Sequence, residues 1–224
     1  VDGNMCGGRR MIRVILFVVG LIILIGVAIE PAKAATITND GFTILYEGDV
    51  VESDVKRMEE MIDSTGITTV FLDSPGGNAM TGYQLGYLFK DKGITAIVGE
   101  DASCFSSCAV AFLGANVKVK QGLLGFHVAW TTANGSMTDG MKQGQVFGTI
   151  TSAYFFKMGY SLQLPYMIAL YTDQDTFLML DVEDLEMFKI DDPADFIELK
   201  DLPKLWTTER IAGPMRRELM IRGM

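Results

Sequence analysis

The chain has 224 residues, 49% of them hydrophobic, so it can bury one sizeable core but is too short for two full domains after an N-terminal leader. Its formal net charge at pH 7 is −9, which argues against nucleic acid or an anionic membrane surface as a partner. We therefore expect one acidic domain of catalytic size.

Residues 1–34 form the first predicted segment, an N-terminal extension followed by a leader. Basic side chains precede the uninterrupted apolar run 14–29, and Pro31 and a small-residue site ending at Ala34 follow it. This order predicts a secretory signal peptide, because the apolar run is slightly shorter than the roughly 20 residues that span a bilayer. The alternative is an uncleaved anchor that attaches the protein to the membrane through residues 14–29. In both cases the basic end stays in the cytoplasm, and the rest of the chain is exported to the periplasm or secreted.

The body of the chain, residues 35–200, alternates between strand and helix patterns. Its first predicted elements are a strand at 42–46, a helix at 51–62, a strand at 67–72, a helix at 79–90 and a strand at 94–98. Asp49 and Glu52 have the spacing of a capping box at the start of the first helix. The strand at 67–72 is β-branched and apolar almost throughout, as in a parallel sheet covered on both faces. The alternation predicts an α/β fold with right-handed crossovers and a mostly parallel sheet.

The second half of the body continues this pattern with smaller elements. We expect a buried helix at 107–115, strands at 117–119 and 123–128, a loop at 131–140 and a helix around 147–158. Prolines then punctuate acidic and basic residues, which predicts a loosely attached C-terminal tail over 201–224.

The chemistry of the chain centres on His127, its single histidine. A serine hydroxyl needs an adjacent base to become a nucleophile near neutral pH, so a serine mechanism here must use this imidazole. The pair Ser106-Ser107 stands at the predicted start of a buried helix, where the helix N-terminus favours negative charge. The glycine turn at 75–77 follows a strand and would let the backbone approach a substrate. An ordinary N-cap and an ordinary strand-to-helix turn are the structural alternatives.

Four segments together resemble the serine peptidase subunit of the Clp protease, within the wider Clp/crotonase superfamily. They are Leu72 to Gly77, Ser106 to Ala115, Gly125 to His127, and Thr172 to Leu178. The resemblance covers about Phe42 to Asp192 and implies a Clp/crotonase-like spiral of ββα units. It also implies Ser107 as nucleophile, His127 as base, Asp175 as third triad member, and the N–H groups of Gly77 and Cys108 as oxyanion donors. Subunits of this family assemble into oligomers, so the resemblance implies a homo-oligomer.

Three choices within this site stay open at the level of sequence. Ser106 could replace Ser107 as nucleophile, because a shift of one residue at a helix start rotates the side chain by about 100°. Cys108 could itself be the nucleophile, since a helix N-terminus lowers a thiol pKa. Asp173 could take the place of Asp175. The chain also departs from the family, because Cys-Ala follows Ser107 where the family has Met-Gly, and the interval to His127 is shorter.

Cys104 and Cys108 form an even pair in a compartment that permits disulfides, because Cys6 lies in the leader. They could bridge only if the turn between them departs from ideal helix. With His127 they could also be counted as three zinc ligands, but zinc sites usually have further close ligands and none follows here. We therefore expect no metal and no cofactor.

The function expected from these observations is an exported, ATP-independent serine peptidase acting on peptides or unfolded segments. No phosphate-binding loop of the Gly-x-x-x-x-Gly-Lys-Ser/Thr type occurs in the sequence. One alternative is a catalytically inactive Clp-like protein that binds peptides or builds an oligomeric scaffold. Another is crotonase-type acyl-CoA chemistry, whose substrates are cytosolic. A third is a membrane-anchored peptidase of the serine–lysine type, for which no lysine here has an identifiable match.

Overall fold

The computed structural model describes residues 34–129, 136–190 and 220–222. The predicted leader, apart from Ala34, lies outside the described residues, and so does most of the predicted tail. Among the residues that the structure describes, no helix is both long enough and apolar enough to cross a membrane.

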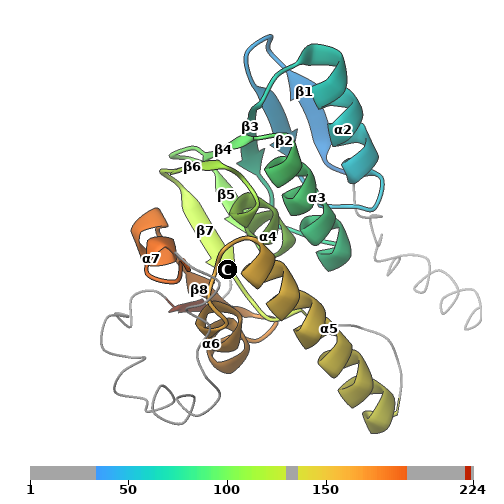
Figure 1. The fold of residues 1–224 in the computed structure, drawn as a ribbon, viewed down its shortest axis with the longest axis vertical. Coiled ribbons are helices and arrows are strands. Elements are labelled where there is room, and N and C mark those ends of the chain that lie inside the picture. Colours follow the sequence, from blue (N-terminus) through green and yellow to red (C-terminus); the bar gives the residue numbers. More distant parts are fainter. Residues whose placement is uncertain (1–33, 130–135, 191–219, 223–224) are drawn as a thin grey trace, which may run out of the picture. The chain divides into compact units, whose positions relative to one another are not determined.

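A five-stranded sheet forms the first layer, with strand order β1-β2-β3-β4-β6. Its strands are β1 (Thr36–Asn39), β2 (Ile44–Glu47), β3 (Thr69–Asp73), β4 (Thr95–Val98) and β6 (Val117–Lys120). Only the pair β1–β2 is antiparallel, and the other three pairs are parallel. The helices α2 (Asp54–Thr65), α3 (Ala79–Asp91) and α4 (Ser107–Leu113) lie on one face of this sheet (Figure 1). This follows from right-handed crossovers that all step in the same direction along the sheet.

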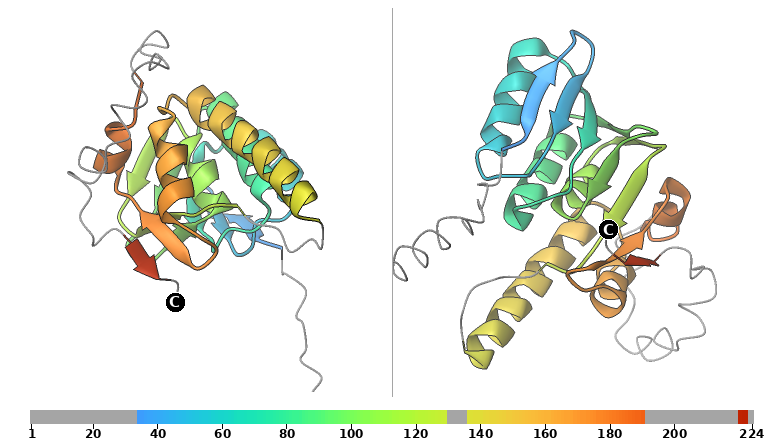
Figure 2. Two further views of the ribbon diagram at one scale, coloured as in Figure 1. Left: turned by 90° about the horizontal axis from the view of Figure 1, so that it is seen from below. Right: turned by 180° about the vertical axis from the view of Figure 1, so that it is seen from behind.

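A second sheet has the strand order β5-β7-β8-β9. It contains β5 (Ser103–Phe105), β7 (Leu123–Phe126), β8 (Thr176–Met179) and β9 (Met220–Arg222). The pair β5–β7 is parallel, and β8 runs antiparallel to both of its neighbours. The later helices are α5 (Met137–Lys157), α6 (Gln163–Tyr171) and α7 (Val182–Glu186), and Figure 2 shows two further views of this arrangement.

The order of elements repeats a ββα unit. In β4–β5–α4 and again in β6–β7–α5, the first strand joins the five-stranded sheet and the second joins the smaller one. The predicted α/β fold with a mostly parallel sheet and ββα units is therefore confirmed. The repeat also carries the ends of β5 and β7 to neighbouring positions, because these two strands pair directly.

Glycines bring α3 and α4 into close contact. A Cβ on Gly114 would lie 2.0 Å from the carbonyl oxygen of Gly86, and a Cβ on Gly82 would lie 2.7 Å from the Cβ of Ser107. Any side chain at these positions would force the helices apart, since such distances are far below van der Waals contact. The backbone of α4 is therefore fixed against α3, and one side of its first turn is covered.

Several details differ from the sequence-based expectation. The strands β1, β5 and β9 and the helices α6 and α7 were not predicted, and β7 ends one residue before His127. The predicted capping box is wrong, because α2 begins after Ser53 without a side-chain cap. The carboxylate of Asp54 takes the local donors instead, accepting hydrogen bonds from the Val51 N–H and the Tyr46 hydroxyl, each at 2.8 Å.

Candidate active site

Ser106 stands at a sharp turn between a strand and a helix. The strand β5 ends at Phe105, the helix α4 begins at Ser107, and Ser106 between them has φ 55° and ψ −121°. It is the only non-glycine residue with positive φ among the described residues. A strained turn of this kind projects a serine hydroxyl out of the chain, as in the nucleophile elbow of α/β-hydrolases. Strain of about 1–3 kcal/mol persists only where the surroundings hold the residue in place.

Hydrogen bonds on both sides of Ser106 supply that constraint. Its N–H donates to the Gly125 carbonyl on β7 at 2.9 Å, and its own carbonyl accepts from the Val110 N–H at 3.1 Å. The glycine turn after β3 packs on the same point, because a Cβ on Gly76 would lie 2.6 Å from the Cβ of Ser106. Gly76 has φ 94°, a conformation that favours glycine. The elbow is therefore clamped between β7 and the glycine turn.

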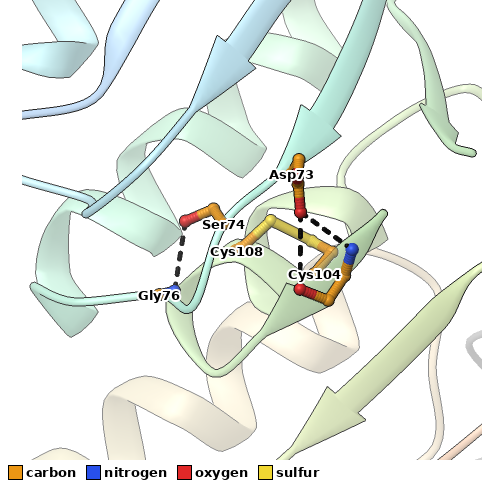
Figure 3. Close-up of a disulfide and its surroundings, with 6 residues drawn as sticks. Asp73, Ser74, Gly76, Cys104 and Cys108 are labelled. Carbon is orange, nitrogen blue, oxygen red and sulfur yellow. Dashed lines mark hydrogen bonds between the residues drawn. A yellow bond between two sulfur atoms is a disulfide. The ribbon is translucent and has the colours of Figure 1, made fainter. Parts of the chain in front are cut away.

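A disulfide brackets the same turn. Cys104 in β5 and Cys108 in the first turn of α4 are joined, with their Cα atoms 5.2 Å apart (Figure 3). Both cysteines are buried. The bridge cross-links the strand before Ser106 to the helix after it, and Cys108 has no free thiol to act as a nucleophile in this structure.

His127 follows β7 directly and reaches the elbow. Its Nε2 lies 2.6 Å from the Oγ of Ser106, and its Nδ1 lies 3.3 Å from the main-chain carbonyl oxygen of Asp173. The ring of Phe177 packs on the imidazole, with ring centroids 4.6 Å apart. Burial lowers the pKa of His127 below its ordinary value, although the main chain at Asp173 and Gln174 and the Asp173 charge act in the opposite direction. Burial therefore favours the neutral imidazole, the form that can accept a proton.

Ser107, the expected nucleophile, is not brought to His127. It is 2% exposed, and its Oγ has no hydrogen-bond partner among the described residues. The physical reason is its place in the first turn of α4, where its Cβ faces Gly82 of α3. The structure thus joins His127 to the alternative serine, Ser106.

Asp175, the expected third triad member, lies in the same loop but does not contact His127 in the described part of the chain. It is exposed, and its carboxylate accepts from the Gln174 side chain at 3.3 Å. The N–H of Asp175 donates to the carboxylate of Asp173 at 2.9 Å, which closes a short turn. The turn presents the main chain of the loop to the imidazole.

The expected oxyanion donors, Gly77 and Cys108, belong to the two segments that adjoin Ser106, the glycine turn and the first turn of α4. A Cβ on Gly77 would lie 2.4 Å from the Val50 carbonyl oxygen, so only glycine fits there. The N–H that directly follows Ser106 belongs to Ser107, and the Cβ position of Gly76 is 3.1 Å from that nitrogen. Neither the Gly77 N–H nor the Ser107 N–H has a hydrogen-bond acceptor within the described ranges. A pair of unused donors beside a serine suits a developing oxyanion.

Within residues 34–129, 136–190 and 220–222, no group of three or more His, Cys, Asp or Glu side chains is arranged to hold a metal ion. From the sequence, Ser106 was the alternative to Ser107 as nucleophile, and Phe177 was given no role of its own. The strand before Ser106 is the signal that separates the two serines, because a serine between a strand and a helix occupies the elbow.

Comparison with known proteins gives structural similarity only. No protein-family model matches the chain, and no curated protein matches it. A mutant of ClpP1 from Listeria monocytogenes is 16% identical, with a TM-score of 0.49 over 67% of this chain and 88% of that one. A mutant of the 1510-N membrane-bound stomatin-specific protease is 15% identical, with a TM-score of 0.49 over 73% and 82%. Another mutant of that protease, in complex with a substrate peptide, is 13% identical, with a TM-score of 0.45 over 66% and 71%.

Proposed function

We propose that this protein is a serine peptidase in which Ser106 is the nucleophile and His127 the general base. The observation that carries the proposal is the 2.6 Å contact between His127 Nε2 and Ser106 Oγ at a strained strand-to-helix turn. Ser106 is half-buried, so a substrate can reach its hydroxyl, whereas Ser107 is enclosed. The likeness of four sequence segments to the Clp peptidase subunit makes the peptide bond the expected target.

The geometry supports a complete acyl-transfer cycle. The Oγ of Ser106 attacks the scissile carbonyl carbon while Nε2 of His127 takes the hydroxyl proton. The negative charge that develops on the carbonyl oxygen is met by the N–H groups of Ser107 and Gly77, which stabilise it more than they stabilise the planar substrate. The imidazolium then protonates the leaving amine. A water molecule, activated by the same imidazole, hydrolyses the acyl-enzyme and restores the serine.

The wider setting of this activity is part of the proposal. We propose an exported enzyme that works without ATP on peptides or unfolded segments and that assembles from identical subunits. The support for export is the leader at 1–34, and the support for independence from ATP is the lack of a phosphate-binding loop in this sequence.

Labelling with a fluorophosphonate tests the activated serine directly. The full chain is treated with the probe at pH 7.5, beside His127→Ala and Lys120→Ala variants, and hydrolysis of a quenched fluorescent peptide library is followed in parallel. We expect rapid labelling and hydrolysis in the unchanged chain and in Lys120→Ala, and loss of both in His127→Ala. A folded chain that takes up no label would contradict the proposal, and the fold would then serve as a peptide-binding or scaffold protein.

A further inference from the structure

The sequence predicted an aspartate carboxylate on the Nδ1 side of the imidazole, whereas the hydrogen bond in the structure is to a main-chain carbonyl. In a serine mechanism, the group that accepts the Nδ1 proton selects the tautomer with a free Nε2 and orients the ring. A main-chain carbonyl can only accept a hydrogen bond, so the 3.3 Å contact with Asp173 requires Nδ1 to carry the proton. Nε2 is then the acceptor that Ser106 needs. The carbonyl performs the orienting task that a carboxylate performs in a Ser-His-Asp triad.

The position of this carbonyl depends on Thr172. The Thr172 hydroxyl accepts from the Val128 N–H at 2.9 Å and donates to the Ile168 carbonyl at the end of α6 at 2.7 Å. Val128 directly follows His127, and Thr172 directly precedes Asp173. Thr172 is 9% exposed, and its hydroxyl therefore joins the segment after β7, which carries the imidazole, to the segment after α6, which carries the acceptor carbonyl.

Two further contacts hold the acceptor loop against the ring. The strands β7 and β8 pair antiparallel with Phe126 opposite Leu178, so Phe177 lies beside His127 and packs on its ring. The Asp173 carboxylate binds the N–H of Asp175, which fixes the turn from within. In this arrangement the Asp175 carboxylate is exposed.

We propose that the Asp173 main-chain carbonyl is the third member of the catalytic relay, that Thr172 is the positioning residue for it, and that the Asp175 carboxylate takes no part. This inference rests on the proposed peptidase function. In this relay the neutral carbonyl selects the tautomer, and the nearby negative charge of Asp173 adds stabilisation of the imidazolium.

The single histidine makes the test unusually direct. The full chain is produced with ¹⁵N-labelled histidine, and the imidazole nitrogen shifts are recorded at a pH where the ring is neutral, for the unchanged chain and for Thr172→Val, Thr172→Ser and Asp175→Asn. We expect one His127 signal set with a protonated Nδ1 and an unprotonated Nε2 in the unchanged chain, in Asp175→Asn and in Thr172→Ser. In Thr172→Val we expect averaging between the two tautomers, because the isosteric side chain lacks the bridging hydroxyl.

Rates of fluorophosphonate labelling are measured on the same four proteins. We expect Thr172→Val to lose about 10- to 100-fold, as for a misplaced catalytic group, while Thr172→Ser and Asp175→Asn stay within about threefold of the unchanged chain. A protonated Nε2 in the unchanged chain, or loss of the Nδ1–H tautomer in Asp175→Asn, would overturn the inference. If Thr172→Val fails to fold, the tautomer in the unchanged chain and in Asp175→Asn still decides on the carbonyl relay.

The two proposals fail in different ways. An Nδ1–H tautomer in a chain that takes up no probe would leave the acceptor assignment standing and remove the peptidase function. Labelling of Ser106 that Asp175→Asn abolishes would keep the peptidase and remove the carbonyl relay.

Discussion

The Nε2 of His127 lies 2.6 Å from the Oγ of Ser106, the first serine of an adjacent pair. Two neighbouring residues at a helix start point in different directions, and here one faces the imidazole while the other faces α3. The single imidazole of the chain therefore reaches the hydroxyl of Ser106 and not that of Ser107.

Substituting the two serines separately should give opposite results. Ser106→Ala removes the proposed nucleophile and should lower peptide hydrolysis by roughly 10⁵- to 10⁶-fold without unfolding the chain. Ser107→Ala removes a buried hydroxyl that has no hydrogen-bond partner among the described residues, so activity should persist and the free energy of unfolding should rise by up to about 1 kcal/mol. Steady-state hydrolysis and urea unfolding of both variants provide the measurement. Full activity in Ser106→Ala would rule out its assigned role.

The pH dependence of labelling should follow His127. Burial lowers the pKa of the imidazole, so protonation, which blocks proton transfer from Ser106, should occur only below the ordinary histidine value of about 6.5. The labelling rate should therefore fall as the pH drops through this lowered pKa and stay level above it. Rates from pH 4.5 to 8.5 would show the midpoint, and a midpoint above 6.5 would contradict the described burial.

Gly76→Ala should disturb catalysis beyond its effect on stability. A Cβ there would lie 2.6 Å from the Phe105 carbonyl oxygen and from the Cβ of Ser106, so the elbow must shift. Because a misplacement of about 1 Å can cost 10²-fold, we expect labelling to slow by about that factor. Gly93→Ala is the matched control, since Gly93 also has positive φ but nothing lies within 4 Å of its Cβ position.

The control should lose about 1–2 kcal/mol of stability from backbone strain alone, with labelling of the folded protein unchanged. If Gly76→Ala and Gly93→Ala slow labelling to a similar extent, the effect at Gly76 comes from backbone strain at positive φ and not from contact with the turn at Ser106.

Removal of the disulfide should loosen the elbow. A bridge closing a loop this short stabilises the fold by about 2 kcal/mol in the chain-entropy account. The double variant Cys104→Ala/Cys108→Ala should therefore melt at a lower temperature and label more slowly. A reductant should lower the Tm of the unchanged chain toward that of the variant and leave the variant itself unaffected. The unchanged chain is also incubated with strong reductant under denaturing conditions before its Tm is measured. An unchanged Tm after this treatment would argue against the bridge.

Much of the fold could be predicted because β3, α3 and β4 follow simple patterns. The β-branched run near Val70 and the glycine turn after it both match the structure. β5 could not be predicted, because three residues are too few to show a period of two. Without that strand the turn at Ser106 was hidden, and the sequence favoured Ser107.

The hydrogen-bond acceptor for Nδ1 of His127 could not be predicted from the sequence, for a different reason. Which atom of the 173–175 loop faces His127 depends on the Thr172 bridge and on the pairing of β7 with β8. These are contacts between distant segments, and residue spacing carries no information about loop direction. Every residue also has a main-chain carbonyl, so the residue type does not show which carbonyl accepts a hydrogen bond.

Mass mapping of the probe on the unchanged full chain distinguishes the two serines. After fluorophosphonate labelling and digestion, fragmentation of the peptide that contains Ser106 and Ser107 assigns the adduct to one of the two serines. We expect a single adduct on Ser106 that is absent from His127→Ala. An adduct on Ser107 would contradict this expectation, because that hydroxyl would then have to leave its buried position against Gly82 to reach the imidazole.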